Sequence, residues 1–122
     1  MTLQLANVSF DCDDALKVAT FWSAVLDRPL DADASEGFAS IGAGTHGTGG
    51  QGWLFTKVPE PKVAKNRCHV DLVADSHETV ATELDRLVAL GAIVIRLPKE
   101  EFGAYWATLQ DPEGNELCLA AR

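Results

Sequence analysis

The chain has 122 residues, of which 47% are hydrophobic, and a formal net charge of -8. These are the proportions of one globular domain that buries a core without disulfides or structural metal ions. Its ten Lys and Arg residues are scattered, which argues against nucleic acid or an anionic membrane as a partner. The start MTLQLANVSFDCDD has no basic segment leading into an apolar core, and no apolar run could span a bilayer. We therefore expect a cytoplasmic protein.

The first half of the chain predicts a strand, a helix and two further strands. Residues 3–10 form the first predicted strand. Asp13 and Asp14 can cap a helix that begins at Ala15, because Asp is a favoured N-cap residue, and Pro29 ends that helix. Two more strands are expected at 38–41 and 53–57. The glycine-rich segment 42–52 lacks the Lys-Ser/Thr ending of a phosphate-binding loop, so we expect a flap and not a nucleotide site.

The second half repeats this pattern. Residues 7–13 align without a gap on residues 69–75, at a shift of 62 (69 minus 7). The same shift superimposes the apolar stripes of the two predicted helices. In the second copy we expect Asp75 and Glu78 to form a capping-box-like start, and Gly91 to end the helix. Six extra residues fall near 98–103, where a loop is expected.

The last part of the chain predicts a tight turn between two strands. In WATLQDPEGNELCL, residues 106–119, Asp111 and Pro112 open the turn, and Gly114 supplies a positive φ. Strand alternation places Glu116 on the same face as Trp106. A carboxylate therefore shares a face with an aromatic ring.

These elements predict an α+β fold of two tandem βαβββ modules within one domain, residues 1–122. Module one covers about 1–57, a surface linker 58–67, and module two about 68–122. We expect the modules to form one curved mixed sheet, with helices on its convex face and a ligand cleft on its concave face.

Strand alternation also predicts which side chains line this cleft. Aligning Leu54 with Leu117 as core residues turns Trp53 and Phe55 toward the cleft, where their rings form an apolar wall. The full predicted set of catalytic and ligand-binding residues is Asn7, Phe38, Trp53, Phe55, His69, Trp106, Thr108 and Glu116. Cys12, Cys68 and Cys118 are odd in number and far apart, so reduced thiols are expected.

The pattern of CHVDLVAD, opening on His69, and DPEGNE, closing on Glu116, resembles the glyoxalase and bleomycin-resistance proteins of the vicinal-oxygen-chelate superfamily. This resemblance implies a homodimer and a divalent metal ion held at four positions, here Asn7, a residue near Trp53, His69 and Glu116. Tryptophan cannot coordinate a metal ion, and the residues before it are Gly52 and Gln51. Asn7 could offer an amide oxygen to a hard ion, but the good metal ligands are only His69 and Glu116, an incomplete set that argues against a physiological metal.

Two functions follow as hypotheses. The first is a glyoxalase-like lyase or isomerase that acts on a small carbonyl or diol compound, with His69 and Glu116 as acid and base and Asn7 polarising an oxygen. The alternative is a non-catalytic protein of the bleomycin-resistance type, whose acidic aromatic cleft, with Trp53 and Trp106, binds a planar cationic drug or metabolite. A structural or regulatory module without a pocket is a third reading.

Overall fold

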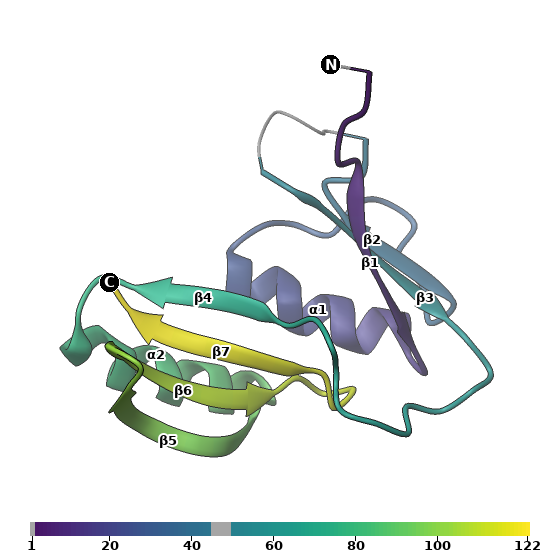
Figure 1. Ribbon diagram of the computed structural model, residues 1–122. Coiled ribbons are helices and arrows are strands. Elements are labelled where there is room, and N and C mark those ends of the chain that lie inside the picture. Colours follow the sequence, from purple (N-terminus) through teal and green to yellow (C-terminus); the bar gives the residue numbers. More distant parts are fainter. Residues whose placement is uncertain (1, 45–49) are drawn as a thin grey trace. The chain divides into compact units, whose positions relative to one another are not determined.

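The computed structural model describes residues 2–44 and 50–122. The chain forms two compact units, Met1–Lys62 and Val63–Arg122 (Figure 1). The boundary between them lies inside the predicted linker 58–67. The centre of the predicted flap, residues 45–49, lies outside the described residues. Among the described helices, none has the length and apolar character needed to cross a membrane.

The first unit contains a three-stranded sheet and one helix. Its elements are β1 (Asn7–Cys12), α1 (Ala15–Leu26), β2 (Phe38–Ile41) and β3 (Gly52–Lys57). The strand order is β1-β3-β2, with β1 parallel and β2 antiparallel to β3. The first strand was predicted at 3–10 but begins at Asn7, because its pairing with β3 runs from Asn7–Gly52 to Cys12–Lys57.

Helix α1 has the predicted bounds because its ends carry explicit caps. The Asp14 carboxylate accepts a hydrogen bond from the Lys17 N–H at 3.1 Å. At the other end Asp27 adopts the left-handed conformation, with φ 52°. The buried side of the helix, which includes Val18 and Trp22, packs on the sheet of its own unit.

The second unit has the complete predicted order of one strand, a helix and three strands. Its elements are β4 (Val70–Ala74), α2 (His77–Leu90), β5 (Ile93–Glu101), β6 (Ala104–Gln110) and β7 (Glu116–Ala121). The strand order is β4-β7-β6-β5, in which β4 and β7 are parallel. The α+β class and the glyoxalase-like module pattern are therefore confirmed. Within the described residues the first unit lacks a strand between α1 and β2.

Two local predictions in the second unit were wrong. Ser76, and not Asp75, caps α2: its Oγ accepts the Thr79 N–H at 3.2 Å, and Thr79 Oγ1 accepts the Ser76 N–H at 2.9 Å. The predicted loop at 98–103 is largely strand, since β5 continues to Glu101 through two register shifts. A proline is tolerated there because β5 is the edge strand and its pairing is irregular.

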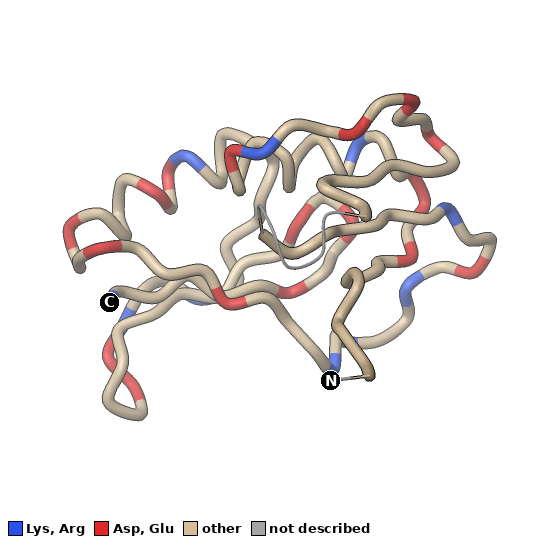
Figure 2. Tube along the Cα trace, turned by 90° about the horizontal axis from the view of Figure 1, so that it is seen from above, with Lys and Arg blue, Asp and Glu red and all other residues tan. Residues whose placement is uncertain are grey.

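The chain is acidic along both units. Figure 2 shows the Lys and Arg residues dispersed among Asp and Glu, which number 18 against 10. Each unit buries its own apolar core between its helix and its sheet. In the second unit this core includes Val80, Leu87, Leu109 and Leu117. The opposite face of that sheet is thereby left for polar side chains.

Candidate functional site

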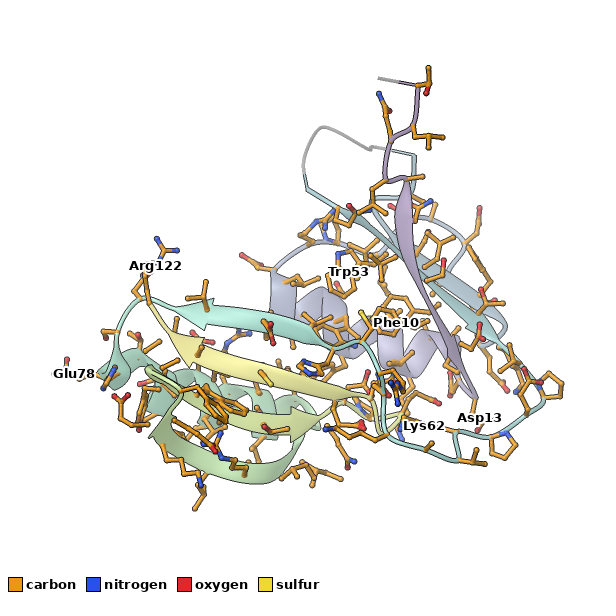
Figure 3. The ribbon with its side chains drawn as sticks, in the orientation of Figure 1. Phe10, Asp13, Trp53, Lys62, Glu78 and Arg122 are labelled. Carbon is orange, nitrogen blue, oxygen red and sulfur yellow. The ribbon has the colours of Figure 1, made fainter. Side chains whose placement is uncertain are left out.

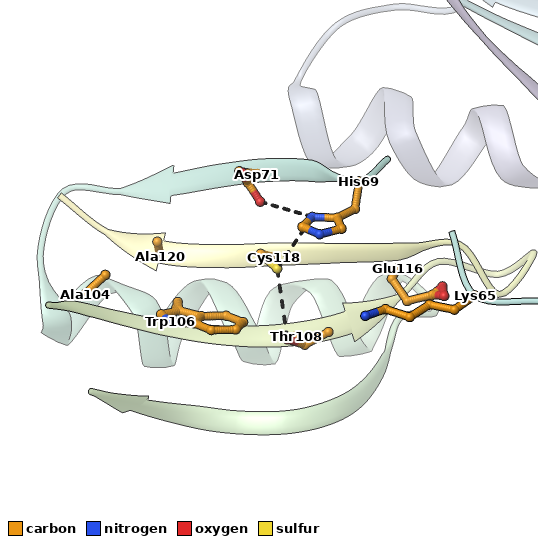
Figure 4. A pocket seen from close by; sticks show the side chains of 9 residues that line it. All are labelled: Lys65, His69, Asp71, Ala104, Trp106, Thr108, Glu116, Cys118 and Ala120. Carbon is orange, nitrogen blue, oxygen red and sulfur yellow. Dashed lines mark hydrogen bonds and ion pairs between the residues drawn. The ribbon is translucent and has the colours of Figure 1, made fainter. Parts of the chain in front are cut away.

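A pocket of about 380 Å³ lies on the sheet of the second unit. Figure 4 shows its side chains on the face of the sheet that points away from α2. Along β6 and β7 its residues alternate with the buried residues Ala107, Leu109, Leu117 and Leu119. The lining consists of Lys65, His69, Asp71, Ala104, Trp106, Thr108, Glu116, Cys118 and Ala120.

His69 forms the centre of the polar group in this pocket. It immediately precedes β4, and its Nδ1 lies 3.4 Å from Asp71 Oδ1. A carboxylate at this distance favours the tautomer with the proton on Nδ1, which leaves Nε2 as the basic nitrogen. The His69 side chain is 41% exposed, so a small molecule in the pocket can reach the ring.

Cys118 lies beneath this pair, 4.0 Å from His69 Nδ1 and 4.0 Å from Thr108 Oγ1. Burial raises the pKa of the Cys118 thiol, the hydrogen bond from Thr108 opposes that effect, and the nearby Asp71 carboxylate adds to it. A raised pKa keeps the sulfur protonated near neutral pH. The thiol therefore lacks the activation that a nucleophilic cysteine requires.

Glu116 is the second acidic group of the pocket. It begins β7 and is buried, with Oε1 accepting the Asn66 N–H at 3.0 Å. This bond ties the segment before β4 to β7. It also brings Lys65, the residue before Asn66, to the pocket beside Glu116 (Figure 4).

The turn that precedes Glu116 is built around a buried carboxylate. Asp111 is only 1% exposed, and its Oδ1 accepts the N–H groups of Glu113 at 2.8 Å and Asn115 at 2.9 Å. Its Oδ2 accepts Asn115 Nδ2–H at 3.0 Å. Gly114 has φ 85°, as the sequence predicts. The DPEGN turn thus fixes where Glu116 enters the sheet.

We predict that Asp111→Ala lowers the free energy of unfolding by about 2–4 kcal/mol, because three donors lose a charged acceptor and two of them belong to a buried residue. Urea unfolding followed by circular dichroism measures the change. Asp85→Ala is the matched control, since Asp85 is exposed on α2. Equal midpoints for the two variants would contradict this role of Asp111.

Trp106 supplies the flat wall of the pocket. The guanidinium of Arg96 stacks on it, with Cζ 3.9 Å from the ring centroid. Arg96 is held in turn by Glu101, whose Oε2 lies 2.5 Å from Nη2. The indole is therefore fixed in place before any ligand arrives.

The structure brings together four of the predicted site residues in this pocket: His69, Trp106, Thr108 and Glu116. Asn7 and Phe38 belong to the first unit. Three further polar residues join the pocket. Asp71 and Cys118 could be found from sequence, because they lie two residues beyond His69 and Glu116 on the same faces of their strands. Nothing in the linker sequence distinguished Lys65.

Trp53 and Phe55 lie elsewhere than the sequence predicts. Trp53 is 8% exposed and stacks on Trp22 of α1, with centroids 5.3 Å apart. Phe10 stacks on Trp53, with ring centroids 5.8 Å apart (Figure 3). Phe10 also stacks on Phe55, with centroids 5.6 Å apart. Both side chains thus face the helix in the core of the first unit. The predicted alternation for this strand is shifted by one residue, because β3 pairs Val8 with Trp53.

This register also decides which residue near Trp53 occupies the remaining metal position implied by the resemblance. Trp53 pairs with Val8 as Leu117 pairs with Val70, so the equivalent of Glu116 in the first unit is Gly52. Glycine offers no ligand, and a Cβ added there would collide with Asn7 Oδ1 and lie 3.0 Å from the Gly42 carbonyl oxygen. The residues present do not fit a four-ligand metal site.

The comparisons with known proteins agree with this fold. The family model of the glyoxalase-like domain matches residues 7–120. The chain belongs to the glyoxalase-like domain family. No curated protein matches the sequence. Its family membership therefore rests on the domain model, and solved structures add to the evidence for the fold.

Three solved structures illustrate this likeness of fold. A glyoxalase/bleomycin resistance protein/dioxygenase family enzyme from Burkholderia phytofirmans PsJN has a TM-score of 0.79 and 20% identity, with 98% of each chain covered. The fosfomycin resistance protein FosX from Listeria monocytogenes has a TM-score of 0.75 and 14% identity, covering 100% of this chain and 95% of that chain. Lactoylglutathione lyase from Agrobacterium tumefaciens has a TM-score of 0.63 and 19% identity, covering 94% and 90%.

Proposed function

We propose that this glyoxalase-like protein is a small-molecule enzyme of the lyase or isomerase type, acting on a small carbonyl or diol compound. The observation that carries the proposal is the pair of His69 and Asp71, whose Nδ1 and Oδ1 atoms lie 3.4 Å apart. The pocket that holds this pair also holds Glu116. A histidine oriented by a carboxylate is a common general base. The lyase named among the structural neighbours supports the reaction class.

The residues of the pocket account for the movement of a carbon-bound proton and of a hydroxyl proton. Asp71 holds the Nδ1 proton, so Nε2 of His69 takes the proton from the carbon next to the substrate carbonyl. The same imidazolium then returns the proton to the neighbouring carbon in an isomerisation, or to a leaving group in an elimination. Negative charge develops on the substrate oxygen, where the Lys65 ammonium stabilises it. In the isomerisation Glu116 takes the hydroxyl proton from one oxygen of the enediol and returns it to the other.

Trp106 gives the substrate a surface to lie on. Its indole is held by Arg96 and forms part of the pocket wall. A planar carbonyl or enediol stacked on this ring would have its reacting carbon held near the sheet. Positioning of this kind supplies a large part of a catalysed rate, because the reacting groups are already oriented.

Exchange of carbon-bound hydrogen with solvent tests this function without knowledge of the natural substrate. The purified protein is incubated in D2O with a panel of small 2-hydroxy and 2-oxo carbonyl compounds and vicinal diols, and deuterium incorporation is followed by NMR. We expect at least one compound to exchange faster than in buffer alone. If compounds of the panel bind but none of them exchanges deuterium, the proposed enzymatic function is contradicted.

One observation favours a binding protein as the second candidate. Trp106 shares the pocket with two acidic residues, Asp71 and Glu116. An aromatic wall with negative charge suits a planar cation. Binding of aromatic cations with no exchange of any panel compound is the result that this candidate predicts.

A further inference from the structure

We propose that the second unit binds a zinc-like divalent cation through His69 Nδ1, a carboxylate oxygen of Asp71 and Cys118 Sγ. These three ligand atoms all lie within 4.8 Å of one another. The site shares His69 with the set implied by the family resemblance but differs in its other ligands, since it uses Asp71 and Cys118 in place of Asn7 and Glu116. It is contained in one unit and needs nothing from the first.

The distances suit a tetrahedral ion. Zinc bonds of about 2.0–2.3 Å place neighbouring nitrogen and oxygen ligands about 3.4 Å apart, and nitrogen and sulfur about 3.6 Å apart. The Nδ1–Oδ1 distance is 3.4 Å. The Nδ1–Sγ distance is 4.0 Å and all three ligand atoms lie within 4.8 Å of one another, so the thiolate and the carboxylate must draw closer together around the ion.

The sheet itself holds the three ligands together. His69 and Asp71 alternate on the same face of one strand segment, and Asp71 is the direct partner of Cys118 across β4 and β7. Backbone pairing therefore sets the spacing of Asp71 and Cys118 before a cation arrives, and His69 stands directly before the paired strand. Thr108 Oγ1, 4.0 Å from Sγ, is placed to orient the sulfur from β6.

The donor set selects the type of cation. The cation displaces the Cys118 thiol proton to solvent and binds the resulting thiolate. A thiolate with an imidazole suits zinc and other borderline transition metals, whereas magnesium and calcium prefer oxygen ligands throughout. Three protein ligands leave a fourth position open toward the pocket. A cation on Nδ1 replaces the proton shared with Asp71, so the cation-bound and proton-transferring states of His69 exclude each other. The inference therefore describes a second state of the same pocket, in which His69 transfers no proton.

Cobalt is the probe that reports the thiolate directly. Purified apoprotein is titrated with Co²⁺, and the sulfur-to-cobalt charge-transfer absorption in the near ultraviolet is recorded. Zinc affinity is then measured by competition with a chromophoric chelator. We expect a one-to-one cobalt complex with this absorption, and its displacement by zinc.

Matched variants locate the ligands. Cys118→Ser removes the absorption and weakens zinc binding at least tenfold to a hundredfold, since even partners outside the first ligands contribute that much. Cys68→Ser, at an exposed thiol, leaves both unchanged. Asp71→Asn alters an exposed side chain, so it keeps the fold; the absorption remains and affinity falls.

Three results would overturn the site. The first is that the wild type shows no sulfur-to-cobalt absorption, and the second is that this absorption survives in Cys118→Ser. The third is that Glu116→Gln loses metal binding while Cys118→Ser keeps it. The last result would assign the metal to the positions of the family resemblance. None of these readouts depends on the exchange assay, so failure of the metal site and failure of the proposed enzyme remain distinguishable.

Discussion

His69→Gln lowers the rate of deuterium exchange by about 10²–10⁴-fold on any compound that the wild type exchanges. Glutamine keeps a polar side chain of similar reach but cannot take a proton at neutral pH. The pocket and its apolar wall stay in place, since His69 lies outside the strand ladder and its side chain is substantially exposed. The loss therefore falls on the chemical step, and binding of the compound changes little.

His77→Gln is the control for this variant. His77 lies at the start of α2 and stacks on Tyr105, with ring centroids 4.2 Å apart, and it is not part of the pocket. The rate of deuterium exchange catalysed by His77→Gln should equal that of the wild type. If His69→Gln retained full exchange, the proton would be moved by another residue and the proposed role of His69 would fail.

Trp53→Ala destabilises the protein by about 3–5 kcal/mol, because the indole fills the core of the first unit. Its ring stacks on Trp22 and Phe10, and truncation leaves a large cavity between α1 and β3. The free energy of unfolding from urea titration measures the effect. Ligand binding in the second unit is expected to persist wherever the variant remains folded.

Trp106→Ala has the opposite pattern. Its ring lies in the pocket wall and is only partly buried, so the free energy of unfolding falls much less than in Trp53→Ala. Ligand affinity is lost because the flat wall is removed. If Trp53→Ala were as stable as the wild type and lost ligand binding, Trp53 would line a ligand site after all.

The placement of Trp53 shows where strand alternation stops being informative. The segment Trp53-Leu54-Phe55 is apolar at three consecutive positions, so either face could be the core. The partner strand decides, and β1 pairs Val8 with Trp53 and Phe10 with Phe55. A register between strands some 45 residues apart is a tertiary property that the local pattern does not contain.

Local chemistry was predictable where a single residue type dominates. Asp14 caps α1, Gly91 ends α2 with φ 121°, and the turn at Asp111 forms as predicted. The start of α2 was placed one residue early because Asp75 and Ser76 are adjacent candidates, and only Ser76 has Thr79 in reach.

Part of the candidate site was predictable from strand alternation. His69, Trp106, Thr108 and Glu116 follow from alternation in strands whose other face is clearly apolar. Lys65 lies in the pocket next to Asn66, whose backbone N–H is bound by Glu116, a contact between residues 50 positions apart. No pattern in the linker encodes that bond.

The most direct test of the central assignment, that the pocket of the second unit is the ligand site, uses the three tryptophans as reporters. The indole N–H signals are assigned by substitution and followed by NMR while the compound that exchanges fastest in D2O is added. We predict a saturable shift of the Trp106 signal, with Trp22 and Trp53 unmoved because both lie in the core of the first unit. A shift of Trp53 with Trp106 unmoved would contradict the assignment.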